Sequence, residues 1–270
     1  MHSMTDSIEG HDSALLIRTA HRMADAARAA ILPFFRSDDL AADNKRPADF
    51  DPVTEADRAA ERAMREVLAT DRPDDGILGE EYGALAGTSG LTWILDPIDG
   101  TRAFISGAAS WGVLIGLSDG QGVRYGLIDQ PYTAERFEGG LGQARMTGPM
   151  GERRLAVRHG VDLSRATLLS TFPEIGTPPE AAAFRRVADR VRLTRYGLDC
   201  YAYGLLAIGQ IDLVIEAGLQ SYDIAGPLAV VQAAGGIVTD WQGGPAHEGG
   251  QVIAAASPEL HRAALELLRG

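Results

Sequence analysis

Apolar side chains recur at helical spacing near the start of the chain. Within residues 12–36 they fall close to one face, which predicts an amphipathic helix. Asp12 or Ser13 can cap the start of this helix, and Pro33 places a bend or an end near its last turn. We therefore expect the chain to begin with a helix that buries one face.

The next stretch is polar and then becomes helical again. Residues 37–53 contain Pro47 and Pro52 and are typical of a loop or a hairpin. Thr54-Glu55-Ala56-Asp57 has the form of a capping box, which predicts a second helix through Leu68. This role makes Asp57 a structural residue rather than a catalytic one.

Short apolar runs then favour strands. Ile77-Leu78 and Trp93-Ile94-Leu95 are typical of buried strands, and residues 111–138 show three further strand-like segments that suggest an antiparallel meander. Gly140 to Arg145 begins like a dinucleotide fingerprint, but the third glycine is missing and no helix follows, so we reject that reading. The glycine-containing residues 139–151 are the best candidate for a boundary between two halves.

After this boundary, predicted strands and helices alternate. We expect strands at 167–171, 191–194, 211–216, 236–240 and 252–255, and helices at 179–189, 200–208, 224–234 and 258–268. Such alternation indicates an α/β layered second half. We therefore divide the chain into residues 1–145, an α+β half with an antiparallel sheet, and residues 146–270, an α/β half.

The charge balance excludes some classes of partner. Lys and Arg number 25 and Asp and Glu number 37, a net charge of −12, which argues against nonspecific binding to nucleic acid or anionic membranes. Cys200 is the only cysteine, so no internal disulfide can form. No signal peptide or membrane-spanning run is evident, so we expect a cytoplasmic protein.

The stretch Trp93 to Thr101 carries the candidate chemistry. Its apolar run ends in Asp96-Pro97 and Asp99-Gly100, both strong turn signals, so the two carboxylates should rise together at a strand end. Charges held this close repel by roughly 4 kcal/mol at an effective dielectric near 20, unless one is protonated or a cation lies between them. Carboxylates and backbone carbonyls are ligands for a hard cation such as Mg²⁺. The alternative is an ordinary surface turn.

A metal site needs further acidic residues from elsewhere in the chain. Glu80 and Glu81 follow a predicted strand and matter only if the fold brings them to Asp96; a pair of this kind is usually solvated. Asp51 precedes the capping box and has no comparable local role.

Four segments together resemble the inositol monophosphatase family of Mg²⁺-dependent phosphatases. They occur in the family's order and spread over most of the chain: Asp51-Pro-Val-Thr-Glu-Ala-Asp57, Gly79-Glu80-Glu81, Trp93-Ile-Leu-Asp96-Pro-Ile98-Asp99-Gly100-Thr101, and Tyr222-Asp223-Ile-Ala-Gly226 leading to Ala234-Gly235-Gly236. The resemblance implies a layered αβαβα sandwich of the inositol monophosphatase and fructose-1,6-bisphosphatase type, a small-molecule phosphate monoester as substrate, and a homodimer.

The resemblance also assigns roles to residues. Glu80, Asp96 and the carbonyl of Ile98 would hold one Mg²⁺, and Asp96, Asp99 and Asp223 a second, with a weaker third ion near Glu80. As catalytic residues, Asp51 and Thr101, with Glu80, would position and polarise the attacking water. The backbone N–H groups of Gly100 and Thr101 would bind the phosphate.

Within the family, the chain is most similar to the histidinol-phosphate phosphatase branch. The segments that carry this similarity are Asp99-Gly-Thr-Arg102-Ala-Phe-Ile-Ser-Gly107, Trp111-Gly112 and Arg195-Tyr-Gly-Leu-Asp199-Cys-Tyr-Ala-Tyr203. Asp199 and Glu216 are candidate substrate-binding residues, because anionic groups suit the ammonium and imidazole of histidinol. Asp199 could instead cap a helix, Glu216 could be a solvated strand end, and Arg195 could meet the phosphate or a carboxylate.

Other functions remain open from the sequence. The same fold and metals could serve inositol 1-phosphate or a range of sugar phosphates, and a non-catalytic interaction protein could share the fold. The retained carboxylates argue against the last possibility. A covalent aspartyl-phosphate route is a lesser one, since it needs Asp96 or Asp99 free of metal.

Overall fold

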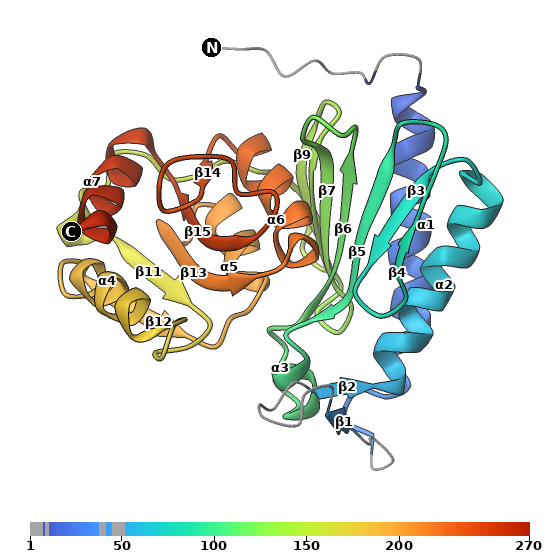
Figure 1. The fold of residues 1–270 in the computed structure, drawn as a ribbon, viewed down its shortest axis with the longest axis horizontal. Coiled ribbons are helices and arrows are strands. Elements are labelled where there is room, and N and C mark those ends of the chain that lie inside the picture. Colours follow the sequence, from blue (N-terminus) through green and yellow to red (C-terminus); the bar gives the residue numbers. More distant parts are fainter. Residues whose placement is uncertain (1–7, 9–10, 38–41, 45–51) are drawn as a thin grey trace.

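The structure, a computed structural model, describes residues 8, 11–37, 42–44 and 52–270. These residues form five layers in the order helix, sheet, helix, sheet, helix, which Figure 1 shows from right to left. The predicted αβαβα sandwich is therefore confirmed.

The first layer consists of α1 (Ser13–Ile31) and α2 (Glu55–Asp71), which pack on each other and on one face of the first sheet. The Asp12 carboxylate caps α1 by accepting a hydrogen bond from the Ala14 N–H at 2.9 Å. The capping box predicted for α2 is present, since Asp57 accepts hydrogen bonds from the Thr54 backbone N–H and hydroxyl. Between the helices, β1 (Ala42–Asn44) and β2 (Pro52–Thr54) form an antiparallel pair.

The first sheet has eight strands in the order β10 (Gly151–Arg154), β9 (Gln143–Gly148), β8 (Glu135–Gly140), β7 (Val123–Gln130), β6 (Gly112–Ser118), β5 (Thr92–Asp99), β3 (Gly76–Gly79) and β4 (Gly83–Leu85). All neighbours are antiparallel except β3 and β5. The predicted meander is confirmed, but it continues through β9 and β10, where no strands were predicted. Residues 145 and 146 lie inside β9, and the chain leaves this sheet only after Arg154.

The middle layer consists of α5 (Tyr201–Ala207) and α6 (Ser221–Ala233). α6 lies very close to the first sheet over Gly116, Gly126 and Gly139, which are cross-strand partners on β6, β7 and β8. A Cβ atom on Gly126 would lie 2.1 Å from the carbonyl oxygen of Gly226 on α6. This line of glycines therefore sets how near α6 approaches the sheet.

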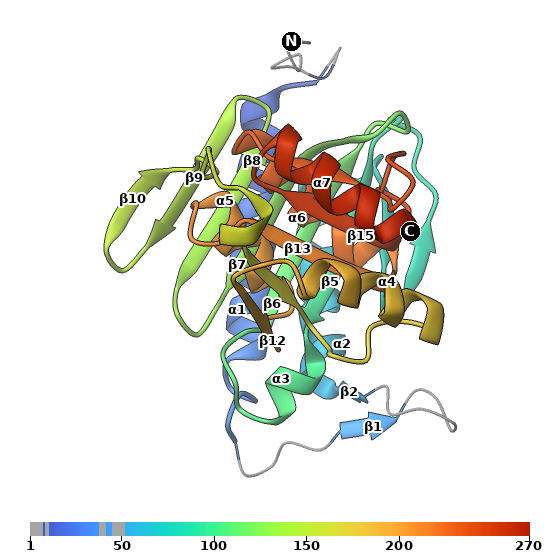
Figure 2. The ribbon, with the colours of Figure 1, turned by 90° about the vertical axis from the view of Figure 1, so that its left-hand side faces the viewer.

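The second sheet has the order β12 (Leu193–Tyr196), β11 (Thr167–Ser170), β13 (Leu213–Leu219), β15 (Gly250–Ala255) and β14 (Ile237–Thr239). The first three strands are parallel, which agrees with the α/β layered second half expected from the alternation of strands and helices. The outer layer consists of α4 (Pro178–Ala188) and α7 (Pro258–Arg269), with a short 3₁₀ helix at Leu163–Arg165 (Figure 2). Among the residues described, no helix combines the length and apolar character needed to cross a membrane.

Candidate active site

The predicted turn after Trp93-Ile94-Leu95 is part of a longer strand. β5 was expected to end at Leu95, but it continues to Asp99. Asp96 pairs with Leu114 and Asp99 with Gly112, so three steps along β5 oppose two along β6, which defines a bulge. Residues three apart in a regular strand point to opposite faces, and the extra residue turns the two carboxylates toward the same side.

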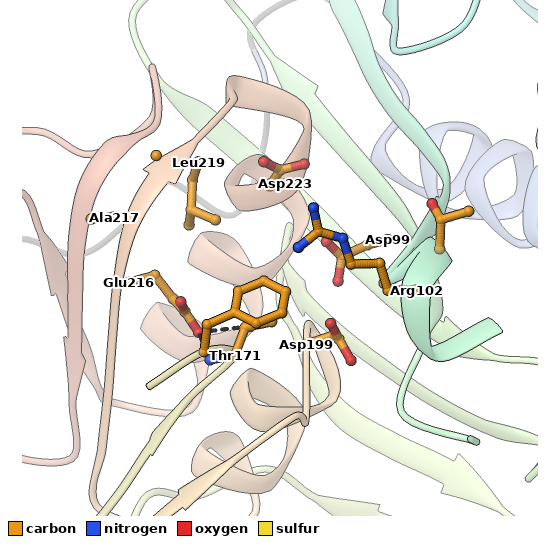
Figure 3. Close-up of a pocket in the computed structure, with 12 residues that line it drawn as sticks. Asp99, Arg102, Thr171, Asp199, Glu216, Ala217, Leu219 and Asp223 are labelled. Atoms are coloured by element: carbon orange, nitrogen blue, oxygen red, sulfur yellow. Dashed lines mark hydrogen bonds between the residues drawn. The ribbon is translucent and has the colours of Figure 1, made fainter. Parts of the chain in front are cut away.

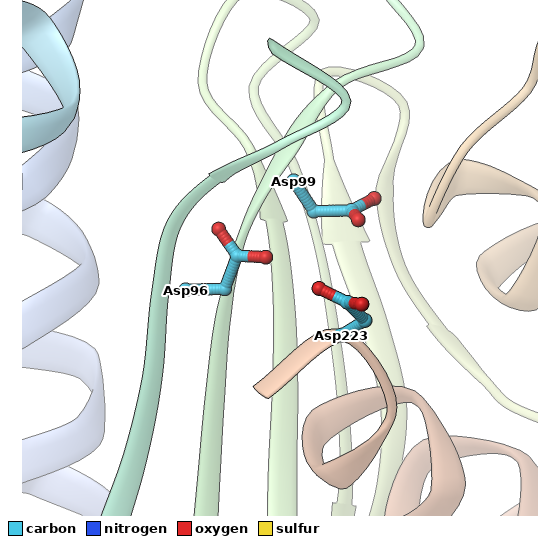
Figure 4. Close-up of side chains that lie close together, drawn as sticks. All are labelled: Asp96, Asp99 and Asp223. Atoms are coloured by element: carbon cyan, nitrogen blue, oxygen red, sulfur yellow. The ribbon is translucent and has the colours of Figure 1, made fainter. Parts of the chain in front are cut away.

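A third carboxylate comes from the second half of the chain. Asp223 lies in the first turn of α6 and accepts a hydrogen bond from the Gln220 N–H at 2.7 Å. Oxygen atoms of Asp96, Asp99 and Asp223 all lie within 4.8 Å of one another (Figure 4). The structure thus brings together three of the predicted metal ligands from distant parts of the chain.

These carboxylates lie in surroundings that oppose their ionisation. Burial, followed by the charges of Glu80, Asp99 and Asp223, raises the pKa of Asp96 well above its usual value. Burial and the charges of Asp223 and Asp199 do the same to the pKa of Asp99. A divalent cation would remove this repulsion, and a set of crowded carboxylate oxygens fits the hard cations Mg²⁺, Mn²⁺ or Ca²⁺.

Glu80 completes the acidic cluster from the end of β3. Its backbone N–H donates to the carbonyl of Leu95 at 3.2 Å, and its side chain is hydrogen-bonded to Asp96. The fold therefore brings Glu80 to Asp96, which was the condition for Glu80 to take part in the site.

The sequence analysis missed the residue that holds the Glu80 turn in place. Glu61 on α2 is fully buried and accepts hydrogen bonds from the N–H groups of Glu81 at 2.7 Å and Tyr82 at 3.2 Å. A Cβ atom on Gly79 would lie 2.0 Å from a Glu61 carboxylate oxygen, so the glycine leaves room for this contact. The only sequence signal was a charged residue directly beside the apolar face of the predicted helix.

The predicted phosphate-binding residues follow the bulge. Gly100 has a φ of 83° and precedes the short helix α3 (Thr101–Ile105). The Thr101 hydroxyl donates a hydrogen bond to the carbonyl of Ile98 at 3.1 Å, so this predicted ligand and Thr101 are in direct contact. Asp51 lies outside the described residues.

A pocket of about 270 Å³ opens beside the acidic cluster (Figure 3). Its walls come from the start of α3, from the end of β11, from β13 and from the first turn of α6, and the residues that line it are Asp99, Gly100, Thr101, Arg102, Thr171, Phe172, Asp199, Glu216, Ala217, Gly218, Leu219 and Asp223. The Arg102 guanidinium lies 5.0 Å from the centre of the Phe172 ring. The pocket therefore combines the cluster with residues of both halves of the chain.

Asp199 does not cap a helix. α5 begins after Cys200, and the Asp199 carboxylate instead accepts a hydrogen bond from the Ser110 hydroxyl at 2.9 Å. Burial raises the pKa of Asp199, against the lowering effects of the Ser110 hydrogen bond and the Arg102 charge. Its position at the pocket wall depends on Gly100, where a Cβ atom would lie 2.9 Å from the Asp199 side chain.

Glu216 is not a solvated strand end. The side chain is 5% exposed and accepts hydrogen bonds from the Thr171 N–H at 2.7 Å, the Thr171 hydroxyl at 3.0 Å and the Ser170 hydroxyl at 3.3 Å. Burial, only partly offset by these hydrogen bonds, raises the pKa of Glu216 to about 8. The strand end is therefore part of the pocket and is held by β11.

Arg195 is the predicted substrate residue that the structure does not bring to the pocket. It lies on β12, the edge strand of the second sheet, pairs with Leu169 and is exposed. Arg195 was a candidate because it lies in the segment that resembles the histidinol-phosphate phosphatase branch, but β12 ends at Tyr196, before the chain reaches Asp199 at the pocket.

Comparison with known proteins agrees with this geometry. The model of the Inositol monophosphatase family matches residues 12–270. The chain is 39% identical over 257 residues to the Bifunctional phosphatase IMPL2, chloroplastic, of Arabidopsis thaliana, covering 91% of this chain and 72% of that protein. It is 35% identical over 248 residues to the Histidinol-phosphatase of Mycobacterium tuberculosis, covering 90% and 93%.

Among solved structures, an inositol monophosphatase from Zymomonas mobilis matches with a TM-score of 0.85 and 41% identity, covering 96% of this chain and 100% of that one. The similar proteins therefore bear the names of more than one phosphatase activity. The chain belongs to the inositol monophosphatase family of metal-dependent phosphatases.

Proposed function

We propose that this protein is an Mg²⁺-dependent histidinol-phosphate phosphatase, which releases histidinol and phosphate within histidine biosynthesis. The observation that carries the choice of substrate is a pair of carboxyl groups, the half-buried Asp199 and the buried Glu216, that line the pocket beside the acidic cluster. Histidinol carries an ammonium group and an imidazole, and carboxylates stabilise both in their protonated forms. Such a cation would in turn favour the ionised forms of Asp199 and Glu216, whose pKa values are raised in its absence. Inositol is neutral and gains less from such surroundings.

The metal cluster supports the hydrolytic chemistry. Asp96, Asp99, Asp223 and Glu80 would hold two to three Mg²⁺ ions, with the Ile98 carbonyl as a further ligand. The ions would supply positive charge to the phosphate and lower the pKa of a water molecule toward neutrality. A protein with a net charge of −12 needs such a local source of positive charge to bind a phosphate ester.

Residues beside the cluster would orient the reactants. The N–H groups of Gly100 and Thr101, at the start of α3, would donate hydrogen bonds to the phosphate. The Thr101 hydroxyl, already placed by the Ile98 carbonyl, would share with Asp51 the orientation of the attacking water. Asp199 and Glu216 would hold the alcohol that leaves.

A phosphate-release panel tests the proposal. Histidinol phosphate, inositol 1-phosphate and adenosine 3′,5′-bisphosphate are compared with Mg²⁺ and with EDTA. We expect the highest kcat/KM for histidinol phosphate and loss of release in EDTA. A preference for inositol 1-phosphate would overturn the proposed substrate, and full phosphate release in EDTA would overturn the proposed requirement for Mg²⁺.

The first alternative substrate is inositol 1-phosphate or a sugar phosphate, which the similarity to the Zymomonas mobilis protein favours. A non-catalytic role is opposed by the retained acidic cluster, and absence of release from every ester of the panel would support it. We also propose a cytoplasmic homodimer, which light scattering and cell fractionation test.

A further inference from the structure

A small recess lies at the inner end of the active-site pocket. It has a volume of about 20 Å³ and shares Asp99, Thr171, Asp199, Glu216, Leu219 and Asp223 with the larger pocket. Its own additional walls are Cys200, which directly precedes α5, and Tyr203 on α5. A space of this size admits one water molecule or one group of similar size, but not an imidazole ring.

Tyr203 has a buried hydroxyl group without a hydrogen-bond partner among the described residues. The side chain is 3% exposed and lies in the first turn of α5, four residues after Asp199. Buried hydroxyl groups almost always have a partner, because an unpaired one loses its hydration without compensation. An unpaired hydroxyl at the wall of this recess therefore indicates that a water molecule or a ligand atom completes the site.

The chemistry of the recess favours a cation. Asp199 and Glu216 are both carboxyl groups. Burial, followed by the charges of Glu216, Asp99 and Asp223, raises the pKa of Tyr203 well above its usual value. The phenol therefore stays neutral and offers lone pairs as well as one proton. Glu216 is already held by Thr171 and Ser170, so the recess is preformed rather than assembled around a ligand.

We propose that Tyr203 is a specificity-determining residue whose hydroxyl oxygen accepts a hydrogen bond from the ammonium group of an amino alcohol phosphate. The ammonium enters the recess beside Asp199 and Glu216, while the phosphate lies at the cluster of Asp96, Asp99 and Asp223. This inference rests on the proposed function and names the substrate class as an alcohol phosphate with a neighbouring primary amine. The imidazole of histidinol then lies in the larger pocket.

The test is a cycle of one enzyme change and one substrate change. Tyr203→Phe removes only the hydroxyl, and the deamino analogue of histidinol phosphate lacks only the ammonium and keeps the ring. In the wild-type enzyme, we expect the analogue to lose about tenfold or more in kcat/KM, mainly through KM, as for a hydrogen bond to a charged group. In Tyr203→Phe, the same substrate change should cost much less, because the partner is already absent.

Tyr201→Phe is the matched control. Tyr201 lies on the same helix, but its hydroxyl donates to Glu135 and it lines neither the pocket nor the recess. We expect Tyr201→Phe to keep the wild-type discrimination between the two esters. Equal losses for both esters in Tyr203→Phe, with a lowered Tm, would assign Tyr203 a structural role and overturn the inference.

Binding of histidinol without phosphate separates this inference from the proposed function. Isothermal titration calorimetry should show a weaker Kd, by about tenfold, for Tyr203→Phe than for the wild type. If histidinol phosphate is a poor substrate and histidinol still binds through Tyr203, the proposed function fails and the inference holds. If turnover is high and Tyr203→Phe changes neither the cycle nor the Kd, the inference fails and the proposed function holds.

Discussion

Replacing Asp99 by Asn should separate metal binding from folding, because the proposed metal site needs the Asp99 carboxylate, whereas repulsion from that carboxylate opposes folding. Its carboxylate oxygen lies within 4.8 Å of those of Asp96 and Asp223. The Cys200 N–H donates to Asp99 at 2.7 Å, and the side-chain oxygen of Asn can accept the same hydrogen bond. Asp99→Asn therefore removes a charge and keeps the local contact.

The distance between the carboxylate oxygens sets how strongly their repulsion destabilises the folded protein without metal. Two full charges 4.8 Å apart repel by about 3.5 kcal/mol at an effective dielectric near 20. The raised pKa values of Asp96 and Asp99 mean that protons offset part of this repulsion when metal is absent. We expect the variant in EDTA to be more stable than the wild type by about 1 to 2 kcal/mol, or roughly 2–4 °C in Tm for a chain of this length.

Thermal unfolding in EDTA and in excess Mg²⁺ measures both effects. Mg²⁺ at about 100 times its Kd should stabilise the wild type by about 2.7 kcal/mol, whereas it should hardly stabilise Asp99→Asn. Phosphate release by the variant should fall to background in parallel. The wild type should therefore have the lower Tm in EDTA and the higher Tm in excess Mg²⁺.

Asp162→Asn is the control, because Asp162 is exposed, makes no side-chain cap contact and carries the same charge. It should change neither Tm nor the response to Mg²⁺. An Asp99→Asn protein that is less stable than the wild type in EDTA, or is equally stabilised by Mg²⁺, would refute the reasoning.

Three further predictions concern the supports of the site and of the fold. Glu61→Gln should lower kcat/KM about tenfold or more by loosening the Glu80 turn, whereas the exposed Glu66→Gln on the same helix should not; equal values for the two would contradict this role. Gly126→Ala should cost about 1–3 kcal/mol in thermal unfolding because its Cβ meets the α6 backbone, whereas Gly122→Ala faces open space and should cost little. Burial raises the pKa of Glu138, but hydrogen bonds from neighbouring side chains outweigh it and bring the pKa to about 2, against an ordinary value of 4.5 for a glutamate. This stabilisation, at most about 3 kcal/mol, is present above pH 4.5 and lost as the pH falls toward 2, so urea unfolding of the wild type and Glu138→Gln should converge over that range; a constant difference would contradict it.

Local signals in the sequence predicted much of the fold. The capping box at Thr54, the alternation of strands and helices after residue 166 and the short apolar runs all depend on neighbours within a few residues. The predicted end of β5 was wrong because it, too, rested on neighbouring residues alone. Asp-Pro and Asp-Gly are turn signals on average, but here Pro97 falls in a bulge, and pairing with β6 carries the strand past it.

Tertiary contacts account for what the sequence could not predict. β9 and β10 lack the apolar alternation of a core strand, since β10 is exposed along its length at the sheet edge. Glu61 acts through the backbone of a turn twenty residues later, and Tyr203 through a recess between two halves of the chain, and neither contact leaves a periodic signal. Arg195 belongs to a segment chosen for its resemblance to a family branch, and such a resemblance does not show that β12 lies at the edge of the second sheet, away from the pocket lining.

The glycine line on the first sheet explains why the metal cluster and the fold depend on each other. Gly116, Gly126 and Gly139 are widely spaced in sequence and become one line only through the register of β6, β7 and β8. This line allows the α6 backbone to touch the sheet, and the same helix carries Asp223 in its first turn. A methyl group added at one of these glycines would therefore shift α6 and move Asp223 away from Asp96 and Asp99, although none of the three aspartates is changed. The packing of the middle layer thus sets the ligand separations, while the repulsion among the ligands opposes that packing until a cation binds.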